Sequence, residues 1–281
     1  MTLPNHVRVL VRGWLHGNVV ALPGDRPTLV DSGYHTGADE TLAFARSQLG
    51  PRLHQVVLTH VHSDHAGGVA EIVAQAGGSL AVAAHADARD LVDRWDERGL
   101  WLGVTGQHLP RFEITETLGD QVVAGDRPWR VIQVPGHATG GVALFDPRDG
   151  VLISGDALWE DGFGAVNPWL DGEERFALAA LALDRIEAVA PRWVVPGHGE
   201  PFTDVVAALQ RARSRLAYMD ERRDRLQALT VLGLLSFLRM GDRTLGRREL
   251  HSRALTIARA FPVDGQDPGA VAEAAIARLV P

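Results

Sequence analysis

The chain has 281 residues, of which 46% are hydrophobic and 22% charged, and its formal net charge is −7. It contains no cysteine, which excludes a disulfide framework and any metal site built from thiolates. A chain of this length can bury a sizeable core without such cross-links.

The sequence also carries expectations about location. No N-terminal stretch combines a charged start, an apolar centre and a small-residue cleavage site, so we expect no secretion signal. The longest apolar run, LTVLGLLSFL at 229–238, is too short to span a bilayer. We therefore expect a soluble cytoplasmic protein with no membrane partner.

The charges are spread unevenly, and the chain has no lysine, so every permanently charged basic side chain is an arginine. Residues 203–281 hold 13 Arg against 9 acids, whereas residues 1–202 hold 15 Arg against 26 acids. Such a split can mark a segment that meets an anionic partner, but a solvated helix face is the commoner explanation. We expect no nucleic-acid partner.

The first hundred residues are predicted to form short strands, with helices between the later ones. Gly50-Pro51 is a strong stop signal for a helix that begins near Ala38. The segment HQVVLTH at 54–60 is typical of a strand buried on both faces. The expected strands are 7–11, 18–22, 27–33, 54–60 and 80–85, and the expected helices are 38–49, 66–76 and 86–98.

Strands resume beyond residue 120 and then give way to helices. The expected strands are QVVAG, WRVIQVPGH, GVALFD, VLISGD and RWVVPGH, with a helix at about 172–190. Leu209, Leu216, Met219 and Leu226 recur at helical spacing, as on one long helix, and further helices fill 229–281. The pattern predicts an α/β body in residues 1–202 and a helical C-terminal region in residues 203–281.

One segment, LTHVHSDHAGG at 58–68, concentrates potential metal ligands. It places His60, His62, Asp64 and His65 within six residues, directly after an apolar strand and before two glycines. Glycines let a backbone turn sharply and approach a ligand closely. A chance cluster of exposed histidines is the plainer alternative, but the segments described next make it a poor explanation.

Three other strands end in the same way, with a polar residue beside glycine. They supply His137 in VIQVPGHATGG, Asp156 in VLISGDALW and His198 in RWVVPGHGEP, while TLVDSG offers Asp31 as a supporting residue. Strand ends in α/β folds gather at one edge of a sheet, where ligands bind. Imidazole and carboxylate groups suit zinc, iron, nickel or manganese. Seven ligands are too many for one tetrahedral ion but suit two ions that share a carboxylate.

These residues resemble the metallo-β-lactamase superfamily, and in particular its glyoxalase II-like hydrolase branch. The resemblance covers about residues 5–202 and implies an αββα sandwich, with the metal site at one edge between two sheets. True β-lactamases of the superfamily carry cysteine or serine at the position of Asp156, so an antibiotic-degrading enzyme is a poor match.

The resemblance also implies a role for each residue of the set. The first metal would be held by His60, His62 and His137, and the second by Asp64, His65 and His198. Asp156 would bridge the two metals, and Asp31 would support the site by hydrogen bonding.

The predicted function is a dinuclear metal-dependent hydrolase. A metal-bridging hydroxide would cleave a carbonyl ester-type bond, a thioester or lactone of a small acyl substrate. We expect two divalent ions, zinc first and iron or manganese as alternatives. Asp64 is further expected to orient the nucleophile and to pass its proton to the leaving group. A homodimer is one option for the assembly.

Three alternatives stay open from the sequence. A metal-dependent nuclease or phosphodiesterase would use Arg211, Arg215, Arg222 and Arg225, if these share a helix face, to bind phosphates. A mononuclear iron sulfur dioxygenase would use a smaller ligand set. A metal-binding protein without turnover would need a closed site.

Two apolar segments bear on the substrate pocket. The segment 157–170 brings Trp159, Phe163, Trp169 and Leu170 to the place where a pocket wall is expected, although plain packing would explain them equally well. The run 229–238 could line an acyl pocket, but we expect it to pack on the body.

Overall fold

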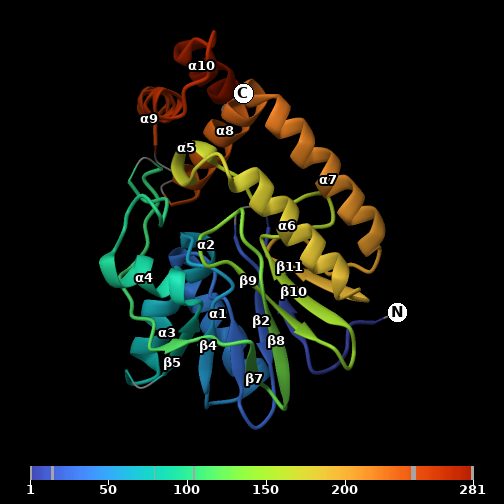
Figure 1. The fold of residues 1–281 in the computed structure, drawn as a ribbon. Helices are drawn as coiled ribbons and strands as arrows, with labels where there is room; N and C mark the ends of the chain where they lie inside the picture. Colours follow the sequence, from blue (N-terminus) through green and yellow to red (C-terminus); the bar gives the residue numbers. More distant parts are fainter. Residues whose placement is uncertain (1, 14–15, 79, 104, 242–244, 280–281) are drawn as a thin grey trace.

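A computed structural model describes the chain apart from residues 1, 14–15, 79, 104, 242–244 and 280–281. Two β-sheets pack face to face, and helices cover the outer side of each sheet (Figure 1). This arrangement confirms the predicted αββα sandwich with C-terminal helices. Among the described residues, no helix is long and apolar enough to cross a membrane.

The first sheet has six strands in sequence order. The first three are antiparallel neighbours, and the pairs from the third to the sixth are parallel. Helices α1 (Ala38–Leu49), α3 (Val69–Gln75) and α4 (Ala86–Arg94) cover its outer face. The strands are β1 (Arg8–Leu10), β2 (Val19–Leu22), β3 (Thr28–Val30), β4 (Gln55–Val57), β5 (Ala81–Ala84) and β6 (Glu116–Thr117).

The second sheet has five strands in the order β11-β10-β9-β8-β7, antiparallel except for the pair β10 and β11. Helices α6 (Arg175–Ala188) and α7 (Val205–Glu221) cover its outer face. The strands are β7 (Gln121–Ala124), β8 (Arg127–Gln133), β9 (Val142–Asp146), β10 (Val151–Gly155) and β11 (Trp193–Pro196).

Apolar side chains from both inner faces form the centre of the sandwich. Leu22 and Val57 of the first sheet meet Trp129, Leu144 and Ile153 of the second. Trp129 is fully buried, and its indole N–H donates a hydrogen bond to the Ala124 carbonyl at 3.2 Å. Truncating such a tryptophan costs about 3–5 kcal/mol, so this layer contributes strongly to holding the two sheets together.

The helix predicted over 66–76 is two helices, α2 (Ser63–Ala66) and α3, separated by Gly67 and Gly68. Here the backbone passes close to the segment after β3, and the Gly68 N–H donates to the Gly33 carbonyl at 3.1 Å. The helix predicted over 86–98 ends early, because Trp95 adopts a left-handed conformation with φ of 49°. The helix over 38–49 is confirmed residue for residue.

The long helix predicted around Leu209 to Leu226 is wrong. Arg222 leaves the helical conformation, with φ of −118° and ψ of 71°, and divides the segment into α7 and α8 (Arg223–Gly241). The break leaves Leu226 in the core of the body while the rest of α8 packs on α9 (Arg247–Ala260) and α10 (Pro268–Leu279). The division of the chain at residue 202 stays a prediction.

Candidate metal centre

All eight residues singled out in the sequence lie at one edge of the sandwich. Each lies in the segment that follows the C-terminal end of a strand, and Asp64 and His65 lie in the short helix α2 within such a segment. The strand ends of both sheets therefore meet at this edge. Asp31 follows β3, residues 60–65 follow β4, His137 follows β8, Asp156 follows β10 and His198 follows β11.

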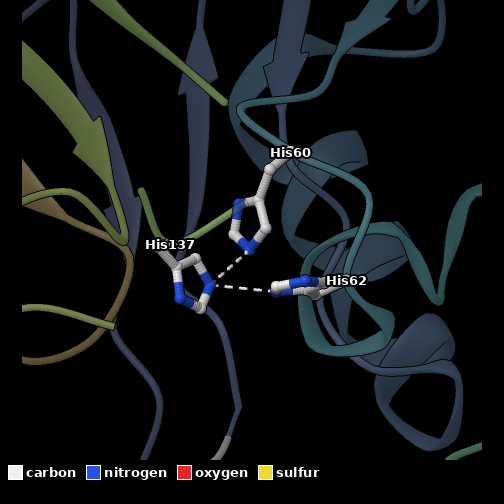
Figure 2. A group of neighbouring side chains, drawn as sticks. All are labelled: His60, His62 and His137. Carbon is white, nitrogen blue, oxygen red and sulfur yellow. Dashed lines mark hydrogen bonds between the residues drawn. The ribbon is translucent and has the colours of Figure 1, made fainter. Parts of the chain in front are cut away.

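Three histidines form a first cluster, which Figure 2 shows. Nδ1 of His62 lies 2.9 Å from Nε2 of His137, and that same Nε2 lies 3.3 Å from Nε2 of His60. One ring nitrogen from each histidine lies within 4.8 Å of the other two. The three nitrogens converge on one point from three sides, as ligands of a single ion do.

A second cluster comprises Asp64, His65, Asp156 and His198, all buried. Oδ2 of Asp64 lies 3.1 Å from Nε2 of His198 and 3.5 Å from Nε2 of His65. Two carboxylates and two imidazoles therefore face one point, a donor set that suits a divalent ion such as zinc, iron or manganese.

Asp156 stands between the two clusters. Its Oδ2 lies 3.4 Å from Nε2 of His137 in the first cluster. Its Oδ1 lies 3.2 Å from Nε2 of His65 and 3.6 Å from Nε2 of His198 in the second. One carboxylate thus offers an oxygen atom to each cluster, which is the arrangement that a bridging ligand requires.

The tautomers in the first cluster follow from the outer partners of the rings. Nδ1 of His137 lies 2.7 Å from the Ala165 carbonyl, which can only accept, so this nitrogen carries the proton. The Thr59 hydroxyl donates to Asp31 at 2.7 Å, so it accepts from Nδ1 of His60 at 3.1 Å. The Nε2 atoms of His60 and His137 therefore face each other with lone pairs, and a cation between them removes this repulsion.

The protonation states of His60, His62 and Asp156 suit the same conclusion, whereas at His65 burial is outweighed by the surrounding acids, which raise the pKa of that ring well above the ordinary value. Burial, assisted by the neighbouring histidines, holds the pKa of His60 and that of His62 well below the ordinary value. Burial by itself raises the pKa of Asp156, but His198 and His65 outweigh it and hold this pKa well below the ordinary value. Neutral imidazoles and ionised carboxylates are the forms that bind metal ions.

Asp31 supports the centre from behind. Its carboxylate accepts hydrogen bonds from the Thr59 backbone N–H at 2.7 Å, from the Thr59 hydroxyl, and from Nδ1 of His65 at 2.8 Å. Its backbone adopts φ of 59°, which is uncommon for a residue with a side chain and is kept only where surrounding contacts require it. These bonds orient His65 and the start of the loop that carries His60.

Glycines allow the close packing around Asp156. A Cβ atom at Gly164 would lie 2.6 Å from Nδ1 of His137 and 2.8 Å from Oδ2 of Asp156. Gly197 leaves the same kind of room between Asp156 and His65. Larger residues at either position would push the ligands apart.

Two tryptophans contact the clusters in ways that the sequence did not indicate. The indole N–H of Trp159 donates to Oδ1 of Asp156 at 3.2 Å. The ring of Trp101 lies against His62, with centroids 4.4 Å apart, and its N–H donates to Asp171 at 3.1 Å. Trp101 lies in a segment without a clear periodic pattern, so no sequence signal could have found it.

A cavity of about 430 Å³ extends from the clusters to the C-terminal helices. Trp159 and Phe163 line it, as the sequence predicted. Trp169 and Leu170 do not lie among its lining residues, and both pack with α8, α9 and α10 instead. The expectation that 229–238 only packs on the body is wrong, because one side of α8 forms a wall of this cavity.

Comparison with known proteins places this site in a family. Residues 12–198 match the sequence profile described as "Metallo-beta-lactamase superfamily". The chain belongs to this superfamily. The match covers every residue of the two clusters as well as Asp31, and the resemblance seen in the sequence is confirmed.

Members of the superfamily with similar sequences include named hydrolases. A probable metallo-hydrolase, YqjP, of Bacillus subtilis is 29% identical over 69% of this chain and 70% of its own length. A hydroxyacylglutathione hydrolase of Cereibacter sphaeroides is 36% identical over 43% of this chain and 40% of its own. The chicken acyl-coenzyme A thioesterase MBLAC2 is 29% identical over 54% of this chain and 59% of its own. This chain therefore spans only about half the length of the last two.

A solved structure of the superfamily shows the same fold. The metallo-beta-lactamase family protein TTHA1429 of Thermus thermophilus matches 99% of this chain and 95% of its own, with a TM-score of 0.62 and 22% identity. The superfamily and the two His/Asp clusters together indicate a metal-dependent hydrolase.

Proposed function

We propose that the protein is a dinuclear metal-dependent hydrolase that cleaves carbonyl ester-type bonds, with a thioester or lactone of a small acyl group as substrate. The observation that carries the proposal is the position of Asp156, which turns one oxygen to each cluster. A protein with a single metal ion would have no use for a carboxylate placed in this way.

The two clusters would hold one ion each. His60, His62 and His137 would bind the first ion, while Asp64, His65 and His198 would bind the second, with Asp156 shared. Two divalent ions, zinc first and iron or manganese as alternatives, supply an activated water and an electrophile for the substrate oxygen when they are bound.

The protein's own groups would prepare the site for this chemistry. Asp31 and the Ala165 carbonyl fix ring orientation at His65 and His137, so the ligand nitrogens are placed before a substrate arrives. Asp64 faces the second cluster and also lines the cavity. Its carboxylate is therefore in a position to accept a proton from the nucleophile and return it to the leaving group.

The apolar lining of the cavity favours a small acyl substrate over a nucleic acid. Most of its wall is apolar, whereas a phosphodiester needs a positive surface. Of the arginines considered for such a surface, Arg211 donates to the Glu160 carbonyl at 2.7 Å and Arg222 pairs with Asp224 at 2.8 Å. Arg211 and Arg215 lie on α7, and Arg215 lines the cavity, but the helix break at Arg222 prevents all four arginines from sharing one helix face.

The sulfur dioxygenase alternative fits less well. A mononuclear iron site would use a smaller ligand set and leave Asp64, His65 and His198 partly idle, although all three are buried at the centre. A location in the cytoplasm and a homodimeric assembly stay predictions from the sequence.

Elemental analysis of the purified protein, combined with a substrate panel, tests the proposal. We expect about two divalent ions per chain and turnover of thioesters or lactones. One iron per chain without hydrolysis would favour the dioxygenase. Cleavage of phosphodiesters alone would favour the nuclease.

A further inference from the structure

The cavity wall opposite the metal clusters is apolar and comes from the C-terminal helices. Helix α8 supplies most of it, and α7 and α10 supply one apolar residue each. These side chains are Met219, Leu226, Leu229, Leu232, Leu234 and Leu279. The wall therefore differs from the polar centre that it faces.

Packing explains only part of this wall. Met219, Leu226 and Leu234 also belong to hydrophobic clusters. Within the described part of the chain, Leu229 and Leu232 belong to neither cluster. Val231 and Leu235 point to α9 and α10 and are fully buried there. Leu229 lines the cavity and is 40% exposed, one of few large apolar side chains in the described chain to be left so open. An apolar side chain that is not needed for packing and faces a cavity is typical of a ligand contact.

Gly233 adds free space to the same wall. A Cβ atom at this position would meet no atom of the described residues within 4 Å, although Gly233 lies in the middle of α8. Glycine in a helix interior lowers the stability of the helix by about 1 kcal/mol relative to alanine, so Gly233 destabilises α8. Gly233 is itself one of the residues that line the cavity, so its missing side chain leaves space there.

Apart from the metal clusters and the two tryptophans, the lining has few polar side chains. Thr230 lies on the wall itself, in α8. The Ser236 hydroxyl donates to the Leu232 carbonyl of its own helix at 2.8 Å. The amide oxygen of Gln107 accepts a hydrogen bond from Ser63. Arg215 and Arg278 are exposed, so they lie where the cavity meets solvent.

We infer that the α8 wall binds the acyl chain of the substrate, and that the enzyme prefers thioesters of longer straight-chain aliphatic acids to those of the shortest acids. This inference rests on the proposed function, because the chain can lie along α8 only if its carbonyl carbon is at the clusters. In the reaction, water adds its oxygen to this carbon, the C–S bond breaks, and the thiol leaves with a proton.

The test uses the metal-loaded full-length protein and N-acetylcysteamine thioesters of straight-chain acids from two to twelve carbons. A buried methylene group contributes enough transfer free energy to raise kcat/KM by up to about fourfold. We expect kcat/KM to rise by about two- to fourfold for each added methylene until the cavity is filled, and then to fall.

Gly233→Leu provides the decisive variant. Leucine is a better helix former than glycine, and its side chain would enter the open space and shorten the cavity. We expect kcat/KM for the longest good substrate to fall by at least about tenfold, with the acetyl thioester changed less than about twofold. Gly119→Leu is the matched control, because a Cβ atom at Gly119 would also meet no atom within 4 Å, and Gly119 is not among the residues that line the cavity.

The outcomes separate this inference from the proposed function. Hydrolysis with no dependence on chain length would overturn the acyl-chain inference and leave the hydrolase proposal standing. If no thioester is cleaved, the hydrolase proposal is left with lactones as its substrates, and calorimetry with decanoate then decides the role of the cavity. Binding that Gly233→Leu weakens by about tenfold or more would support the inference, and absence of binding would overturn it.

Discussion

Oδ2 of Asp31 accepts a hydrogen bond from Nδ1 of His65 at 2.8 Å, which joins the end of β3 to the loop after β4. The bond places the proton of His65 on Nδ1 and turns Nε2 toward Asp64 and Asp156. Because the same carboxylate binds Thr59 through two further donors, it receives only hydrogen-bond donors.

Asp31→Asn should therefore weaken metal binding although it preserves the shape of the side chain. The amide N–H group of asparagine is a donor, and it would take the place of a carboxylate oxygen that accepts from Thr59 or His65. Two donors would then face each other. We expect metal affinity at the second cluster to fall by roughly 10- to 100-fold, measured by chelator competition. Asp93→Asn, an exposed change on α4, is the control, and equal affinity in both variants would contradict the role given to Asp31.

The shared position of Asp156 predicts a difference between two alanine variants. His60→Ala removes a ligand from the first cluster only, so about one ion per chain should remain. Asp156→Ala removes an oxygen from both, so both ions should be lost or weakened. Each variant should lose activity by about 100-fold or more with little change in circular dichroism. Full activity in either variant would show that the dinuclear mechanism is wrong.

A substitution at Gly155 would measure how tightly the end of β10 packs against the loop after β4. Its φ is 51°, and a Cβ atom would lie 2.8 Å from the Thr59 hydroxyl oxygen and 2.9 Å from Thr59 Cβ. Gly155→Ala should destabilise the metal-free protein by about 2–4 kcal/mol, through the left-handed backbone and the clash together. Gly77→Ala shares the positive φ of 76° but meets no atom, so it should cost only about 1–2 kcal/mol. Urea denaturation of both variants measures the difference, and equal losses would show that the contact with Thr59 is loose.

Asp171 makes stability depend on pH. Burial raises its pKa to about 6, although Arg175, the Trp101 indole and Arg98 oppose this shift and Glu174 adds to it. Because the folded-state pKa is above the ordinary value of 3.8, the protonated form favours folding. The resulting stability is complete below about pH 4 and is lost as the pH rises through 6.

Asp171→Asn keeps an acceptor for the Trp101 N–H without the charge. At pH 8 we expect it to be more stable than the natural protein by on the order of 2 kcal/mol, with the difference gone near pH 4. Denaturation of both proteins at several pH values checks this, since the histidines titrate alike in each. A difference that stays constant with pH would show that Asp171 ionises normally.

Much of the fold followed from local sequence signals. The helix over 38–49 ended where Gly50-Pro51 predicted, since these residues act on the backbone next to them. The strands that carry the site were found because buried strands are apolar along their length and end at glycine. The helix break at Arg222 was missed because the periodic positions continue through it, and only packing against α9 and α10 turns the chain there.

The sequence by itself determined the superfamily and which side chains gather, since ligand residues at strand ends must meet at one edge of a sandwich. Only the tertiary structure decided which oxygen of Asp156 faces which cluster, that Trp101 and Asp171 lie behind His62, and that one side of α8 faces the cavity. These relations join residues far apart in the chain. An apolar helix face has the same sequence pattern whether it packs against protein or lines a pocket, so only the neighbours in space distinguish the two.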